Sequence, residues 1–159
     1  KLLIQNKKLF LIFVGSGMLL KKVKKEAKRL KIKNNILFTG YTQYPERYIA
    51  LSNLCVMYSI REGLPRVIPQ YFASGKPVVS TDIPGVEEII INSKNGFIIR
   101  HNSEIDFFNK INFLLKKNKN LLKMTKFAKQ TDVTKWSDKK MPNKIDFVYR
   151  KLLKRYGQN

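Results

Sequence analysis

Short apolar runs alternate along the chain with stretches in which apolar residues recur every three or four positions. The short runs predict β-strands, because each is apolar over a strand's length and ends near glycine or a polar residue. They lie at 9–14, 36–40, 53–59, 77–81 and 96–100. The first run contains no polar residue, which is typical of a strand buried on both faces of a parallel sheet.

The apolar stripes at helical spacing predict helices between these strands. We expect them at about 18–31, at 44–51, from Val67 to a stop at Gly75, and around 86–91. Ser103 is expected to cap a helix whose inner face contains Ile105, Phe108, Ile111 or Asn112, and Leu115. Residues 1–8 resemble the end of a helix, 116–126 a loop with a short helix, and a last helix begins near Pro142.

Strands that alternate with helices form right-handed βαβ units and a parallel sheet covered on both faces. We therefore expect an α/β fold in a single domain over 1–159, which includes C-terminal helices at about 103–156. Ligands of such sheets bind outside the carboxyl ends of the strands. The loops at that edge are Gly15–Gly17, Gly40–Thr42, Ile60–Arg66 and Asp82–Val86.

The loop at Ile60–Arg66 and the helix after it have the most specific chemistry. Glu62 follows a strand, Gly63 allows close backbone approach, and Arg66 and Gln70 share one helix face. Backbone N–H groups of residues 64, 66 and 67 at the helix start are suited to an anion such as a diphosphate. The alternative interpretation is structural: Arg66 pairs with Glu62 and stabilises the turn.

Charge is the outlying property of the composition, with 32 basic and 11 acidic residues and a net charge of +21. Such an excess favours nucleic acid, an anionic membrane surface or a phosphorylated ligand as the partner. Solvation of lysine-rich helix faces and the coding bias of an AT-rich genome are the plain alternatives.

Other chemistries find little support. Cys55 is the single cysteine and lies in an apolar run, which predicts a buried, inert thiol. One histidine and one cysteine provide no metal-ligand cluster and no credible Ser-His-Asp arrangement. No stretch reads as a signal peptide or approaches the length of a membrane span, so we expect a cytoplasmic protein. Any membrane contact would be peripheral, at the inner face of the cell membrane.

Several segments together resemble the C-terminal domain of GT-B glycosyltransferases of family 4, the glycosyl transferases group 1. They are Gly15 after its strand, NNILFTG at 34–40, SIREGLPRVIPQYFASGKPVVSTDIPGVEEII at 59–90 and NGFII at 95–99. The resemblance implies a Rossmann-like domain that binds a UDP- or GDP-type sugar and no metal or other cofactor. It further implies transfer, with retention of configuration, to a glycan or lipid-linked acceptor in bacterial capsule, lipopolysaccharide or related surface polysaccharide synthesis.

The resemblance also implies roles for individual residues. Glu62 takes the catalytic position at the donor sugar. Gln70 stands where the family's second glutamate normally holds the ribose hydroxyls. The other positions that match donor-binding residues are Gly63, Leu64, Arg66 and Val67 at the diphosphate, Thr39, Gly40 and Tyr41 at the base, and Gly15 and Ser16 at the first glycine turn.

Two departures from the family's pattern are expected to matter. The first strand of the Rossmann-like sheet and the family's basic pair would precede residue 1, and the N-terminal acceptor domain is absent. The chain alone is therefore expected to be inactive. Two other classes stay open: a degenerate, non-catalytic module marked by Gln70, and a basic nucleic-acid-binding domain. The spread of lysines over most helices and the lack of an aromatic-basic motif count against nucleic acid.

Overall fold

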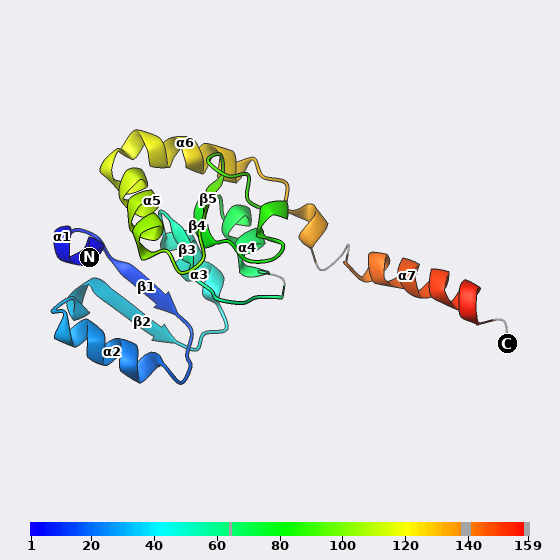
Figure 1. Ribbon diagram of the computed structural model, residues 1–159, viewed down its shortest axis with the longest axis horizontal. Coiled ribbons are helices and arrows are strands. Elements are labelled where there is room, and N and C mark those ends of the chain that lie inside the picture. The colour runs from blue at the N-terminus through cyan, green and yellow to red at the C-terminus, as the bar shows by residue number, and fades with distance from the viewer. Residues whose placement is uncertain (64, 138–140, 158–159) are drawn as a thin grey trace.

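The computed structural model describes residues 1–63, 65–137 and 141–157. Strands and helices alternate along the first two thirds of the chain, and helices complete it (Figure 1). The strands are β1 (Leu11–Val14), β2 (Ile36–Gly40), β3 (Cys55–Met57), β4 (Val78–Thr81) and β5 (Gly96–Ile99). The α-helices are α1 (Leu2–Gln5), α2 (Leu20–Arg29), α3 (Pro45–Leu51), α4 (Val67–Ala73), α5 (Glu104–Lys116), α6 (Asn118–Lys129) and α7 (Met141–Tyr156). Single turns of 3-10 helix lie at Lys33–Asn35, Val86–Glu88 and Thr134–Trp136.

All paired strands are parallel, as the alternating pattern predicts, but hydrogen bonds group them into two sheets. One sheet contains β1 and β2, and the other has the order β3–β4–β5. In the Rossmann strand order 3-2-1-4-5-6, the first strand lies between the second and the fourth. If the five strands correspond to the second to sixth of such an order, the position of the first strand falls between β1 and β3, where the structure is divided.

The expectation that the first strand is buried on both faces is wrong for the end of β1. Phe13 and Val14 are 40% and 39% exposed. Their neighbour on one side is β2, where the ring of Phe13 lies 5.8 Å from that of Phe38. Within the described residues β1 has no strand on its other side, so apolar side chains suited to a central strand stay partly in water.

The three-stranded sheet carries the core on both of its faces. Consecutive side chains of a strand point to opposite faces. Val78 accordingly packs with Ile68 and Phe72 of α4, whereas Val79 packs with Ile111 and Leu114 of α5. All six side chains are less than 9% exposed. This double covering is the packing that the sequence pattern predicts for a Rossmann-like α/β sheet.

Helix boundaries agree with the sequence at several signals. Gly75, two residues after the end of α4, has a φ of +67°, and the hydroxyl of Ser103 accepts a hydrogen bond from Asp106 N at 3.2 Å at the start of α5. The inner face of α5 was predicted incorrectly in part, because Ile105 is 71% exposed while Leu114 is fully buried. The segment predicted as a loop and short helix is instead the twelve-residue α6.

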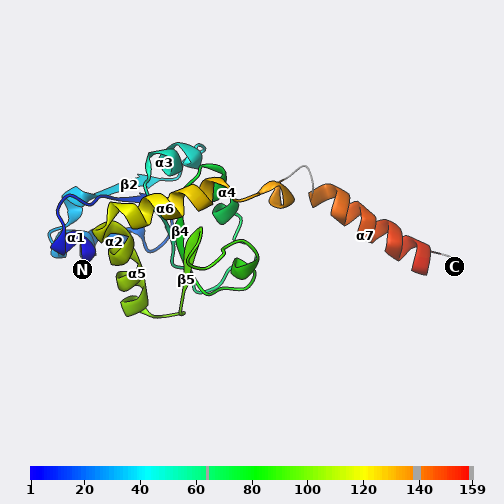
Figure 2. The same cartoon turned by 90° about the horizontal axis from the view of Figure 1, so that it is seen from above.

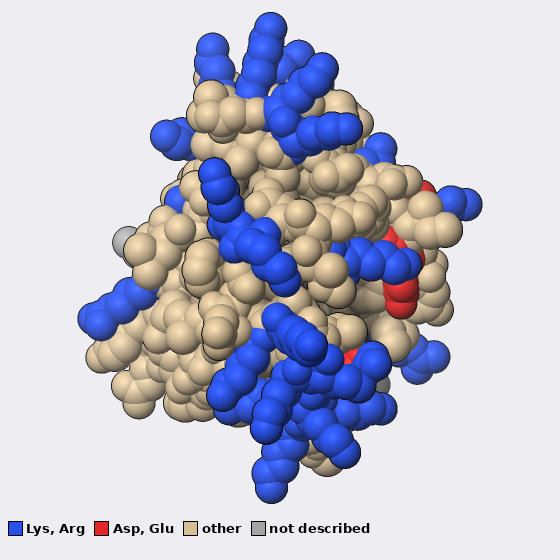
Figure 3. All heavy atoms as spheres, turned by 90° about the vertical axis from the view of Figure 1, so that its left-hand side faces the viewer, with Lys and Arg blue, Asp and Glu red and all other residues tan. Residues whose placement is uncertain are grey.

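Helix α7 extends away from the rest of the protein, as two perpendicular views show (Figures 1 and 2). Its expected apolar stripe is present but lies in solvent, since Val148, Leu152 and Tyr156 are all about half exposed or more. Among the described residues, no helix is long and apolar enough to cross a bilayer. Lysine and arginine side chains crowd the end of the molecule opposite α7 (Figure 3).

Candidate functional site

Two glycine turns meet at the carboxyl ends of β1 and β2. Gly15 N donates a hydrogen bond to Gly40 O at 3.0 Å, and the two residues have φ values of +114° and +70°. Residues with a side chain rarely adopt such values, so both turns depend on glycine. The structure therefore joins the first glycine turn to the segment that the resemblance places at the base.

The neighbouring residues of these turns present polar groups at the same edge. Thr39 Oγ1 donates to Gly40 O at 2.8 Å, and Thr42 Oγ1 accepts from Tyr44 N at 3.1 Å. Ser16 and Tyr41 are exposed, with 78% of Tyr41 open to solvent. An exposed aromatic ring beside a glycine turn is available for stacking on a planar ligand.

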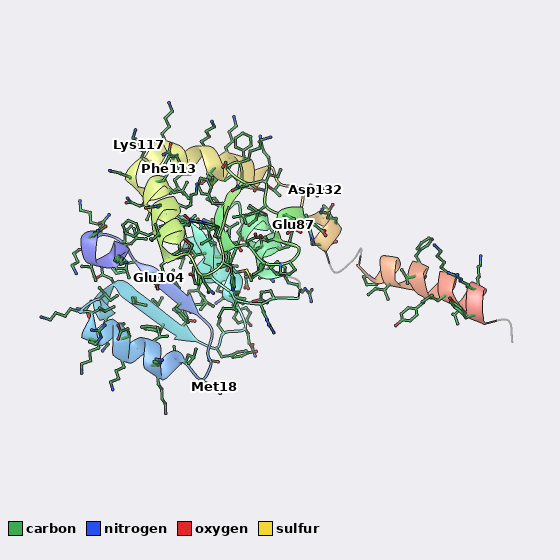
Figure 4. The ribbon with its side chains drawn as sticks, in the orientation of Figure 1. Met18, Glu87, Glu104, Phe113, Lys117 and Asp132 are labelled. Carbon is green, nitrogen blue, oxygen red and sulfur yellow. The ribbon has the colours of Figure 1, made fainter. Side chains whose placement is uncertain are left out.

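A cavity of about 300 Å³ opens beside the first glycine turn. It is lined by Phe13, the loop 15–19, and Leu20 and Val23 of α2. Met18 is 99% exposed at the tip of this loop and points away from the body of the protein (Figure 4). The glycine turn thus borders open space at the carboxyl edge of β1.

Two hydroxyl-bearing residues connect the carboxyl ends of β3 and β4. Thr81 Oγ1 donates to Ser59 O at 2.7 Å and accepts from Ser59 N at 3.2 Å. Thr81 is 1% exposed, so its hydroxyl is satisfied inside the protein. This bridge fixes the point at which the chain leaves β3 and enters the loop with Glu62.

Glu62 is exposed in this loop. Its carboxylate is bound by Ser59, the residue that Thr81 fixes at the start of the loop. Ser59 Oγ donates to Glu62 Oε1 at 3.0 Å. The alternative in which Arg66 pairs with Glu62 is not realised, because no ion pair or hydrogen bond between these two described residues is formed. The carboxylate is positioned by a neutral hydroxyl and faces solvent.

The start of α4 follows at once. Arg66 is the exposed residue that precedes the helix, and Pro65 is buried. Ile68 N donates to Pro65 O at 3.0 Å, whereas Val67 N has no acceptor among the described residues. The side chain of Val67 packs on the core, so only its backbone can meet a ligand. Leu64, the remaining residue predicted here, lies outside the described residues.

Gln70 lies one turn along α4 from Arg66, and both side chains are exposed. This agrees with the shared helix face that their spacing predicts. Gly63 is also exposed, and an added Cβ there would meet no atom within 4 Å. The loop and helix therefore place an exposed acid, an exposed amide and a backbone N–H close together in the sequence, with Arg66 at the start of the helix.

The predicted burial of the thiol is confirmed. Cys55 is 6% exposed, and burial raises the pKa of its thiol to about 12. No cluster of three or more potential metal-ligating side chains occurs in the part of the chain that the structure describes.

Sequence reasoning missed the part played by Ser59 and Thr81. Both residues belong to the motif that was singled out, but no role was assigned to either. The signal was available, because each hydroxyl lies at the carboxyl end of a predicted strand and neighbouring parallel strands end at one edge.

The family model of glycosyl transferases group 1 matches residues 1–131. The chain belongs to this family. It is 34% identical over 88 residues to the Vi polysaccharide biosynthesis protein VipC/TviE of Salmonella typhi, which covers 55% of this chain and 15% of that protein. It is 31% identical over 107 residues to the putative glycosyltransferase EpsD of Bacillus subtilis, covering 67% of this chain and 28% of that protein.

The fold has solved counterparts. The structure of Anabaena Alr3699/HepE in complex with UDP is similar to this group 1 glycosyltransferase, with a TM-score of 0.74 and 24% identity. The similar region covers 82% of the present chain and 39% of the Anabaena chain. That likeness supports the Rossmann-like fold. The chain spans less than a third of the length of the two curated relatives, at 15% and 28%.

Proposed function

We propose that this chain is the C-terminal, donor-binding part of a retaining family 4 glycosyltransferase that uses a nucleotide-diphosphate sugar, with UDP as the first nucleotide to test. The observation that carries the proposal is the arrangement of Glu62, oriented by Ser59, directly before the exposed N-terminal end of α4. Membership of the group 1 family and the UDP in the similar Anabaena structure support it.

The proposed chemistry requires no protein nucleophile. An acceptor hydroxyl forms a bond to the anomeric carbon on the face that the nucleotide leaves, while the bond from that carbon to the diphosphate oxygen breaks. The electron pair stays on the diphosphate, and the acceptor's proton passes to the departing oxygen. Glu62 would bind hydroxyls of the donor sugar, and the backbone of Val67 with the guanidinium of Arg66 would meet the developing negative charge.

The nucleoside would lie between the two parts of the site. Thr39, Gly40 and Tyr41 would border the base, and Gly15 and Ser16 would approach the diphosphate or sugar. Gln70 would accept or donate a hydrogen bond at the ribose, since an amide retains an acceptor oxygen. No metal or further cofactor enters this proposal.

The proposal also covers the acceptor and the compartment in which it is bound. The acceptor would be a glycan or lipid-linked sugar in cell-surface polysaccharide synthesis, bound in the cytoplasm by an N-terminal domain. A basic pair ahead of Lys1 would add the cations that the leaving diphosphate needs. The 159 residues by themselves would then bind donor weakly and transfer little sugar.

Titration of the labelled chain with UDP, followed by amide NMR, tests the proposal. We expect concentration-dependent shifts at Gly15, Gly40 and residues 62–70, with weaker effects for uridine because it lacks the diphosphate. Arg66→Gln should weaken UDP binding, whereas Lys94→Gln, which removes the same charge just ahead of β5, should not. An absence of shifts throughout 62–70 at millimolar UDP would reject donor binding.

One specific observation favours a second candidate. Gln70 replaces an acid in the family's motif, which is expected of a degenerate module that has lost transfer activity. Such a module would retain the fold and the Ser59–Glu62 contact but would bind nucleotide only when the acid is restored.

A further inference from the structure

Positive charge is segregated along the chain. Residues 1–45 contain eleven basic residues and one acidic residue, and residues 107–131 contain seven lysines and no acidic residue. Residues 46–106, which carry most of the candidate site, contain six basic and seven acidic residues. A coding bias toward lysine would not by itself spare the middle of the chain, and the charge excess does not serve the Glu62 loop.

Helix α2 carries the first group of these charges. Lys21, Lys25 and Lys28 are four and three residues apart, so they share one face of the helix, and all three are exposed. The acid of this helix, Glu26, is already bound by the guanidinium of Arg29, with Nε to Oε2 at 2.8 Å. None of the three lysines has an acidic group within 4 Å among the described residues.

The corner between α5 and α6 carries the second group, which comprises the exposed residues Lys116, Lys117 and Lys119. Together with Lys21, Lys25 and Lys28 we name these residues the basic face. Figure 3 views the end of the molecule at which both groups lie: lysine and arginine side chains gather at its bottom, over α2, and at its top, where α5 turns into α6. Clustered like charges repel one another, so their presence indicates an anionic partner.

Apolar side chains are exposed beside the same lysines. Phe113, which lies next to Lys117 at the helix corner (Figure 4), is 52% exposed, and Leu122 of α6 is 61% exposed. Phe10, at the amino end of β1, is 72% exposed. Lysines interspersed with exposed phenylalanine and leucine are the composition of surfaces that lie in a lipid headgroup layer.

We propose that the basic face binds the surface of an anionic lipid bilayer. Its two lysine groups are spread over separate helices, as contact with an extended charged plane requires. A strand of nucleic acid would instead favour a groove with rings for stacking, and Leu122 cannot stack on a base. Strands β1 and β2 begin at this end and run away from it, and α2 begins after the glycine turn of β1 and returns toward this end (Figure 1).

The experiment is cosedimentation of the 159-residue chain with vesicles at physiological ionic strength. Vesicles of phosphatidylcholine mixed with phosphatidylglycerol should bind the chain, and vesicles of phosphatidylcholine alone should not. Each lysine near such a surface contributes about fivefold to partitioning, so Lys21→Gln, Lys25→Gln and Lys28→Gln together should weaken binding about a hundredfold. Glutamine retains helix propensity, and circular dichroism verifies that the variant is folded.

A control triple variant, Lys94→Gln with Lys151→Gln and Lys154→Gln, has the same net charge but alters residues before β5 and on α7. It should retain most of the vesicle binding. Equal losses in both triple variants would show that net charge, or the exposed apolar stripe and basic residues of α7, is responsible rather than the basic face, and would overturn the proposal. Absence of binding to the anionic vesicles would do so as well.

Binding of the chain to poly(dT) is the third measurement. Tighter binding to poly(dT) than to vesicles, lost through the same three α2 substitutions, would reassign the face to nucleic acid. The proposal is independent of donor binding, because UDP titration reports on residues 62–70 and vesicle binding on α2 and the helix corner. Either result can fail while the other stands.

Discussion

Thr81 and Ser59 exchange two hydrogen bonds across the carboxyl ends of β4 and β3, at 2.7 and 3.2 Å, through the single buried hydroxyl of Thr81. One side chain thereby satisfies both the N–H and the C=O of the residue that begins the Glu62 loop. Ser59 in turn donates through its own hydroxyl to Glu62 at 3.0 Å. The position of the candidate acid consequently depends on a chain of contacts that starts inside the sheet.

Replacing Thr81 with valine tests this dependence. Valine has nearly the same shape, but it leaves the backbone N–H and C=O of Ser59 without their partner. We expect the free energy of unfolding to fall by about 1–3 kcal/mol. Urea denaturation measures the loss, and Thr81→Ser, which retains a hydroxyl, should recover most of it. Equal destabilisation by valine and serine would mean that the methyl packing, and not the bridge, holds the loop.

The Thr81–Ser59 bridge also marks the limit of what the sequence reveals. Apolar runs and glycine stops were sufficient for the five strands, for α2 and for α4, because these signals are local. The pairing of β1 with β2 apart from β3–β5 depends on hydrogen bonds between distant segments, which local patterns do not encode. Helix α6 was underestimated because frequent lysines conceal a sparse apolar stripe in which only Met124 and Ala128 are buried.

The candidate site was likewise predictable from the sequence only in part. Spacing alone placed Arg66 and Gln70 on one helix face, and the resemblance identified Glu62. The partner of Glu62 was not predictable from charge. Opposite charges four residues apart suggested Arg66, but the turn places Ser59 at hydrogen-bonding distance instead. The meeting of Gly15 with Gly40 depends on the β1–β2 register, which includes an irregularity between Phe13 and Val14.

A contrasting pair of glycine substitutions distinguishes a glycine that the fold requires from one that the candidate site requires. A Cβ on Gly96 in β5 would lie 2.6 Å from the backbone oxygen of Val78 and 2.9 Å from its Cγ1. We expect Gly96→Ala to destabilise the protein by about 1–3 kcal/mol through this overlap. A Cβ on Gly63 meets nothing within 4 Å, so Gly63→Ala should change stability by less than about 0.5 kcal/mol.

The two substitutions should affect UDP binding in the opposite order to their effects on stability. Under the proposed function, Gly63→Ala weakens UDP binding because the added methyl group prevents close backbone approach. Gly96→Ala, assayed below its melting temperature, should bind UDP like the unmodified chain. Thermal unfolding and UDP titration of the two variants provide the four measurements. If Gly63→Ala leaves UDP affinity unchanged, the loop does not approach the ligand through its backbone.

Cys55 provides a check on the core around β3. Burial raises the pKa of its thiol to about 12, so almost no thiolate is present at pH 8. We expect Ellman's reagent to react with the folded chain far more slowly than with the chain in denaturant. A variant that combines Cys55→Ala with Ser16→Cys moves the single cysteine to an exposed turn and should react quickly without denaturant. Comparable rates for the two folded proteins would indicate frequent opening of the sheet.

Asp106 should show a small acid-dependent effect. A hydrogen bond from Arg100, 2.7 Å from Nε to Oδ2, holds the pKa of the Asp106 carboxyl below its usual value of 3.8. Because the folded pKa is depressed, the pair stabilises the fold above that usual value, and the contribution disappears as the pH falls through the folded pKa. NMR titration of the carboxyl should show the lowered pKa, and Arg100→Gln should raise it. The effect on stability is small, because the pair is exposed.

Gln70→Glu decides between an active donor domain and a degenerate module. The side chain is exposed on α4, so the substitution should change stability by less than about 0.5 kcal/mol. A carboxylate accepts hydrogen bonds from ribose hydroxyls more strongly than an amide does, by about a factor of two in energy. We therefore expect UDP to bind Gln70→Glu more tightly. The analogue with 2′-deoxyribose should gain less, because one of the two hydroxyls is gone. A gain from undetectable to clear UDP binding would favour the degenerate module. Equal gains for UDP and its deoxy analogue would show that residue 70 does not contact the 2′-hydroxyl of the ribose.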